Sequence, residues 1–331
     1  MRFMDRPLCY LVAVLILAGS YSPTLRAAEV TQLKDEAGNT IVEYILEAPA
    51  NVAPAGTTDP GKQVGVIFCF QEHGEPTGTD LYPVRESLKR LGLTDKFILL
   101  AAHSQDPAGK MAPADQVAFL KLLKWAEKNY PVNPPHVYMY GKGEGAKISG
   151  EFAVMHPDVV TAAISYSWGW WSMPSELDKP IDMENSAAEF YLVLGLRDLS
   201  HHVTTVRDTY ERLRAKGYHT IYREFDELGD RSYHPVSNDD ALSWATRLRN
   251  KNIPPSAEEM NLLKAFSASK PPAPISGYYP TLALVGGTPA GEVLQKLFIS
   301  SDATIRAAAA ETCSQGIFGE ATSAALGKTA C

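Results

Sequence analysis

The chain has 331 residues, of which 45% are hydrophobic and 21% charged, so it holds enough apolar material for a large buried core. Its formal net charge is -7, and its 31 lysines and arginines are scattered along the sequence. This distribution excludes a basic stripe of the kind that binds nucleic-acid phosphates.

The N-terminal 28 residues have the features of a secretory signal. Arg2 and Arg6 precede an apolar run over 10–18, and small residues follow, with plausible cleavage after Ala27 or Ala28. The run is short of the roughly 20 apolar residues that cross a bilayer. An uncleaved N-terminal anchor is the alternative. We expect a secreted or periplasmic protein with no membrane attachment once the signal is removed.

The cysteines add little to this picture. Cys69 lies inside an apolar run and is expected to be a core residue, and Cys313 could pair with Cys331 in an oxidising compartment. The sequence has no CxxC or HExxH spacing, so we expect no structural zinc site and no cofactor.

Between residues 64 and 250, apolar runs of strand character alternate with amphipathic helical stretches. This alternation predicts an α/β protein with a mostly parallel sheet, helices on both faces, and a site at the carboxyl ends of the strands. A preceding segment, 40–49, alternates like an antiparallel edge strand. We predict strands over 64–70, 96–102, 136–141, 161–168, 189–195 and 219–225, and helices over 81–92, 114–130, 146–155, 203–216 and near 238–250.

The composition changes after residue 250. We predict a proline-rich linker over 251–279 with one helix at 257–266, and then a small all-α, alanine-rich region over 280–331. The last region resembles short HEAT-like repeats, with Asp302 and Arg306 in the turn between paired helices. An ordinary helical appendage is the alternative. These helices are the predicted surface for a protein partner.

The predicted strand at 136–141 runs into a glycine-rich turn, Gly141-Lys142-Gly143-Glu144-Gly145, and then a helix. This stretch and the elements around it, about 40–250 within a domain of 29–250, resemble the α/β-hydrolase superfamily, most of all its esterase and dienelactone-hydrolase-like branches. That family carries G-x-S-x-G at this turn, with serine as the nucleophile. The resemblance puts Gly143 at the serine position.

The same resemblance implies an acid and a histidine further along the chain. Asp198 follows the strand at 189–195 and matches the acid, and His234 follows the last strand and matches the histidine. Asp198 could instead cap the next helix, and His234 could be an exposed loop residue. His201 and His202 are interpreted as surface residues.

The family's oxyanion hole implies two backbone N–H donors. One is that of Glu144, and the other belongs to the loop that contains His73 and Gly74, which could equally be a plain turn. Trp168 begins an aromatic segment that is expected to line the pocket, or to plug the helix layer.

Gly143 has no oxygen for the histidine to deprotonate. The sequence therefore predicts a degenerate hydrolase that binds a small acyl or glycan-like ligand. Two alternatives stay open. One is an active hydrolase in which His234 activates water or a displaced serine, such as Ser165 or Ser167. The other is a helical-repeat interaction protein that carries a hydrolase-like domain.

Overall fold

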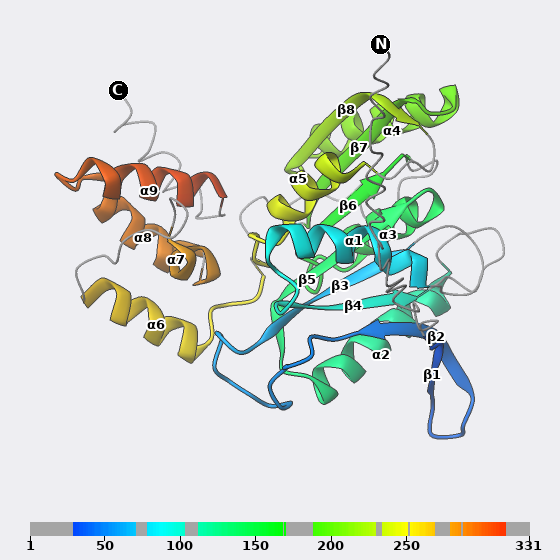
Figure 1. The fold of residues 1–331 in the computed structure, drawn as a ribbon, viewed down its shortest axis with the longest axis horizontal. Coiled ribbons are helices and arrows are strands. Elements are labelled where there is room, and N and C mark those ends of the chain that lie inside the picture. Colours follow the sequence, from blue (N-terminus) through cyan, green and yellow to red (C-terminus); the bar gives the residue numbers. More distant parts are fainter. Residues whose placement is uncertain are drawn as a thin grey trace, which may run out of the picture.

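The computed structural model describes residues 29–70, 78–102, 112–167, 169, 188–229, 234–250, 252–268, 279–285 and 287–315. Within these segments, a sheet carries helices on both faces, and a second group of helices lies at one end of it (Figure 1). The predicted signal, 1–28, lies outside the described residues, as does Cys331. Signal removal and the pairing of Cys313 therefore stay predictions.

The sheet has eight strands in the order β1-β2-β4-β3-β5-β6-β7-β8. The pairings of β1 with β2 and of β2 with β4 are antiparallel, and all the others are parallel. Every residue of β3 and β4 is buried, as expected for parallel strands that are covered on both faces. The strands are β1 (Thr31–Lys34), β2 (Thr40–Glu47), β3 (Val64–Phe70), β4 (Phe97–Ala102), β5 (Val132–Lys142), β6 (Ala162–Tyr166), β7 (Glu189–Arg197) and β8 (Thr220–Gly229).

Two hydrophobic cores hold the helices to the sheet. One core joins the sheet to α2, α3 and α4, and the other joins it to α1 and α5. Successive residues of β3 alternate between them, with Phe68 in the first and Cys69 in the second. Cys69 is fully buried, as predicted, and burial raises the pKa of its thiol well above the usual range. The helices are α1 (Gly78–Leu91), α2 (Pro113–Asn129), α3 (Glu144–Met155), α4 (Ser200–Ala215) and α5 (Pro235–Ala245).

The predicted fold class is confirmed, with one difference at the margin of the sheet. The segment predicted as an edge strand forms β2 and is antiparallel, but β1 pairs along its outer side. β1 has only four residues and lies largely exposed, so its sequence shows no buried face from which to predict it.

The C-terminal helices form a core of their own. They are α6 (Ala257–Ala268), α7 (Pro280–Val285), α8 (Gly287–Phe298) and α9 (Ala303–Gln315). Leu263 and Phe266 of α6 share this core with Leu282, Leu294 and Ala309, so the helix of the predicted linker packs with the helices that follow it. In the described segments, no helix combines the length and the hydrophobicity needed to cross a membrane.

A buried ion pair fixes α6 to the α/β domain. Arg249 Nη2 lies 3.1 Å from Glu259 Oε2, with side chains only 7% and 3% exposed. Glu259 also accepts from the Ser256 N–H at 2.7 Å, and the Ser256 hydroxyl accepts from the Glu259 N–H at 3.1 Å. This reciprocal capping box starts α6 where the chain leaves the α/β domain.

The predicted HEAT-like turn lies between α8 and α9. Asp302 Oδ1 accepts from the Thr304 N–H at 2.8 Å and so caps α9, while Arg306 donates to the Ser300 carbonyl at 2.7 Å. Both side chains therefore order this connection. The rest of the predicted repeat region, from residue 316 on, lies outside the described residues, so the repeat stays a prediction.

Candidate functional site

Gly143 joins the end of β5 to the start of α3, which forms the strand–turn–helix that the sequence predicts. Its φ is 57° and its ψ is -130°, a conformation that costs little for glycine and strains other residues. Its N–H donates to the Tyr166 carbonyl at 3.2 Å, and its own carbonyl accepts from the Ala146 N–H at 2.9 Å. The turn therefore bonds to β6 on one side and to α3 on the other.

The outer glycines of the turn meet a different requirement. A Cβ atom added to Gly141 would lie 2.0 Å from the Gly145 carbonyl oxygen and 2.6 Å from the Ala146 nitrogen. No side chain fits at that distance from rigid backbone. The close approach of β5 to the first turn of α3 thus explains why Gly141 stands opposite Gly145.

Two serines lie beneath the turn and have structural partners. Ser165 Oγ donates to the Ala146 carbonyl at 3.0 Å, and Ser149 Oγ donates to the same carbonyl at 2.9 Å. Both residues are at most 1% exposed. Their hydroxyls fasten the start of α3 to β6, which accounts for Ser165 without a role as nucleophile.

Ser167 follows β6 with a φ of 62°, and it alone has a positive φ among the described residues other than glycine. Its N–H donates to the Val193 carbonyl at 2.8 Å, which continues the β6–β7 pairing by one residue, and the residue is 2% exposed. A non-glycine residue in this region carries backbone strain, which concentrates at functional sites.

Asp198 follows β7 and is 8% exposed. Its Oδ2 accepts from the Gly195 N–H at 3.2 Å, so the carboxylate turns back toward its own strand. In the described structure, the cap position of α4 belongs to Leu199, and no side chain makes a capping hydrogen bond there. Leu199, and not Asp198, therefore occupies the cap position of α4.

His234 is the N-cap of α5. Its Nδ1 accepts from the Ser237 N–H at 3.2 Å, and its ring packs against Phe225 with centroids 5.2 Å apart. In this rotamer Nδ1 accepts, so a neutral ring carries its proton on Nε2. In a working triad the proton lies on Nδ1 and is donated to the acid.

No hydrogen bond joins Asp198 to His234 among the described residues. Both nevertheless lie at the same end of the sheet as the turn. Tyr166 accepts from the Gly143 N–H through its carbonyl, and its hydroxyl pairs at 2.8 Å with that of Ser237, whose N–H bonds to His234. The catalytic roles of Asp198 and His234 stay predictions.

The oxyanion-hole residues are only partly placed. Glu144 is the first residue of α3, so its N–H lies in the helix's first turn, where backbone donors are not used within the helix. His73, Gly74 and Trp168 lie outside the described residues, and their roles stay predictions.

His202 is the residue that sequence reasoning placed wrongly. His201 is exposed as expected, but His202 is 2% exposed and lies in the first turn of α4. The sequence held the signal, because His202 begins a stripe at helical spacing with three other buried residues, Val206, Thr209 and Leu213.

In the described segments, no three His, Cys, Asp or Glu side chains gather as a metal site would require. The described part of the candidate site thus consists of the turn at Gly143, the Asp198 carboxylate and the His234 ring, at the carboxyl ends of the strands.

Sequence comparison finds no match to a known protein family and none to a curated protein. Solved structures do match in fold. A fluorophosphonate-binding serine hydrolase of Staphylococcus aureus, with substrate bound, matches with a TM-score of 0.50 at 12% identity over 66% of this chain and 98% of its own. A ferulic acid esterase matches at 0.49 and 14% identity over 66% of this chain and 97% of its own. At identities this low, the similarity is one of fold alone. The chain has an α/β-hydrolase-type fold followed by a small all-α region.

Proposed function

We propose that this chain is an exported, degenerate hydrolase, which keeps the serine-esterase architecture but binds its ligand without acyl transfer. The observation that carries the proposal is Gly143, whose backbone occupies the tip of the strand–turn–helix with no side chain. The places of Asp198 after β7 and of His234 after β8 support the esterase architecture.

The chemistry follows from what a nucleophile must supply. Covalent catalysis needs an oxygen or sulfur that a neighbouring base deprotonates, and glycine has neither. Removing the nucleophile from a serine triad costs about a millionfold in rate where it has been measured. The remaining groups, Asp198, His234 and the N–H of Glu144 with those expected from His73–Gly74, then serve to bind a small acyl or glycan-like ligand, and Trp168 lines its pocket.

Hydrolysis of short p-nitrophenyl esters by the mature protein tests the proposal. Wild type should match buffer, and Gly143→Ser should exceed it at least about tenfold, since even a small part of a millionfold effect is measurable. Gly143→Ala is the matched control, because it adds the same backbone strain without the hydroxyl. Wild-type turnover that is abolished by His234→Ala would reject the proposal in favour of direct catalysis.

The alternative hydrolase reading now rests on Ser167 or on a water molecule, since the Ser165 hydroxyl has structural partners. Because its φ is strained, Ser167 is the favoured candidate nucleophile in this alternative. Ester hydrolysis in wild type that is lost in Ser167→Ala and kept in Ser149→Ala would support this alternative.

The third reading makes the C-terminal helices an interaction module. Their separate core and the exposed Ile299, at 75%, are the features that favour it. Sedimentation of the full chain and of an Ile299→Glu variant tests self-association as its simplest form, and identical sedimentation of both as monomers would remove that form.

A further inference from the structure

A cavity lies at the amino end of the parallel strands, opposite the candidate hydrolase site. Its volume is about 480 Å³, within the range of small-molecule sites. It is lined by residues at the amino ends of β3, β4 and β5, with Leu262 of α6 and Thr281 of α7 on the far side. The cavity therefore lies between the α/β domain and the C-terminal helices. The Arg249–Glu259 ion pair joins these two parts of the protein.

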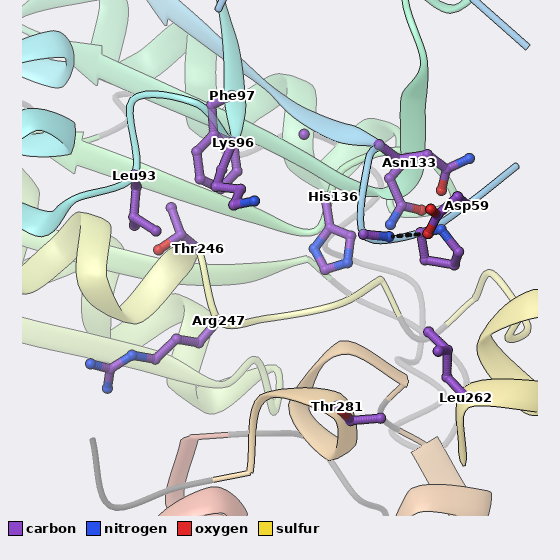
Figure 2. Close-up of a pocket in the computed structure, with 14 residues that line it drawn as sticks. Asp59, Leu93, Lys96, Phe97, Asn133, His136, Thr246, Arg247, Leu262 and Thr281 are labelled. Carbon is purple, nitrogen blue, oxygen red and sulfur yellow. Dashed lines mark hydrogen bonds between the residues drawn. The ribbon is translucent and has the colours of Figure 1, made fainter. Parts of the chain in front are cut away.

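His136 lies at the centre of this cavity, between Asn133 and Asp59 on one side and Thr246 and Lys96 on the other (Figure 2). Its Nδ1 lies 2.9 Å from the Tyr138 hydroxyl oxygen. The Tyr138 hydroxyl donates its single proton to the Leu248 carbonyl, at 2.7 Å. Nδ1 must therefore be the donor to Tyr138, and a neutral ring keeps a bare lone pair on Nε2.

Nε2 of His136 is buried, and within the described part of the chain no protein group donates to it. Burial, and then the charge of Arg249, lower the pKa of His136 to about 4, so the ring is neutral at physiological pH. Nε2 is thus a fixed acceptor beside the cavity, and the described protein groups do not compensate its desolvation.

The accessible surface of the lining is mainly apolar, although Asp59, Lys96, Asn133 and Arg247 also lie in it. Phe97, which is 7% exposed, packs edge-on against Tyr138 with centroids 5.9 Å apart, and it forms an aromatic wall. Leu93, Leu262 and Pro60 complete the apolar surface. An aromatic wall beside a buried acceptor suits a ring or short chain that carries a hydroxyl or N–H donor.

We propose that this cavity is a binding site for small phenol-like compounds, whose ring lies against Phe97 and whose hydroxyl donates to His136 Nε2. The site is separate from the candidate hydrolase site. About seven residues of β5 separate His136 from Gly143, which is roughly 20 Å at the rise of a strand. Occupancy of one site therefore does not require the other.

Calorimetric titration with 4-propylphenol and with its methyl ether tests the proposal. The ether keeps the ring and lacks the donor. The full chain should bind the phenol about tenfold more tightly than the ether, as expected for one hydrogen bond to a buried acceptor. In His136→Leu this ratio should fall to about one, with the ether bound at least as tightly as in wild type.

His136→Leu leaves the Tyr138–Leu248 bond in place, so the variant should fold. Leu262→Trp gives a second measure, because Leu262 lines the cavity and a larger side chain there should weaken the binding of both ligands. Equal affinities for the two ligands in wild type, an unchanged ratio in His136→Leu, or no binding of either at its solubility limit would each overturn the proposal. None of these outcomes depends on Gly143.

Discussion

Glycine is required at two positions of the candidate elbow for two different reasons. At Gly141 the obstacle is steric, because a Cβ would meet the Gly145 carbonyl at 2.0 Å. At Gly143 it is conformational, with φ at 57° and ψ at -130°. A serine at Gly143 would therefore strain the turn, whereas any side chain at Gly141 would displace α3 from β5.

These causes predict a rank order of stabilities. Gly141→Ala should lower the free energy of unfolding by more than about 3 kcal/mol or prevent folding, and Gly143→Ala should lower it by about 1 to 3 kcal/mol. Gly38→Ala is the control, since Gly38 has φ 85° and nothing within 4 Å of an added Cβ; it should cost about 1 kcal/mol. Urea denaturation measures all three, and equal losses for Gly141→Ala and Gly38→Ala would contradict the steric argument.

His136 predicts a sensitivity of folding to acid. Its folded pKa of about 4 lies below the ordinary 6.5, so between these values the unfolded chain binds more protons. Stability is therefore full above pH 6.5 and is lost progressively as the pH falls toward 4, by about 3 kcal/mol in all. Unfolding of wild type and His136→Leu across this range should show a smaller loss in the variant, and parallel curves would contradict the assignment.

The role of a single residue could be predicted where a local sequence pattern indicated it. It could not be predicted where a contact between separate side chains or a rotamer determined it. The turn around Gly143 was readable from its glycines and from the strand and helix beside it. The capping role of His234 was not, because it depends on the rotamer that bonds to Ser237. The cavity around His136 is lined by residues from distant parts of the chain, so no local sequence pattern predicts it.

Among the elements, α6 shows how one helix ties two parts of the molecule together. Glu259 belongs both to the capping box of α6 and to the buried pair with Arg249. Glu259→Ala would leave the Arg249 guanidinium buried without its carboxylate, which is the costly way to break an ion pair.

We expect Glu259→Ala to lower the free energy of unfolding by about 3 to 5 kcal/mol. Glu127→Ala, which breaks the Lys124–Glu127 pair at 2.7 Å at the protein surface, is the control and should cost under about 1 kcal/mol. Arg249→Met combined with Glu259→Leu should recover much of the loss, since an apolar pair needs no compensating charge. A loss in Glu259→Ala no larger than in the control would show that the pair does not hold α6.

The strands were predicted well wherever burial on both faces made their sequences continuously apolar, as in β3 and β4. The prediction failed at β1, which is short and exposed and gains its structure from pairing with β2. Strand pairing joins separated segments, so a single sequence does not display it.

At the scale of the whole molecule, the two ends of the parallel strands differ in chemistry. The carboxyl end holds the turn at Gly143 together with Asp198 and His234, and the amino end holds the cavity around His136 under the C-terminal helices. Sites at the carboxyl end follow from the general behaviour of parallel sheets. The cavity at the amino end forms because α6 and α7 cover it and line one of its sides.

Reaction with an organophosphonate ester that modifies activated serines, read by intact-protein mass spectrometry, tests the central claim most directly. If no hydroxyl faces a working base at the elbow, wild type and Gly143→Ala should stay unmodified, while Gly143→Ser should gain one adduct at the substituted position. A stoichiometric adduct on any serine of the wild-type protein, Ser167 above all, would contradict the account and restore an active hydrolase.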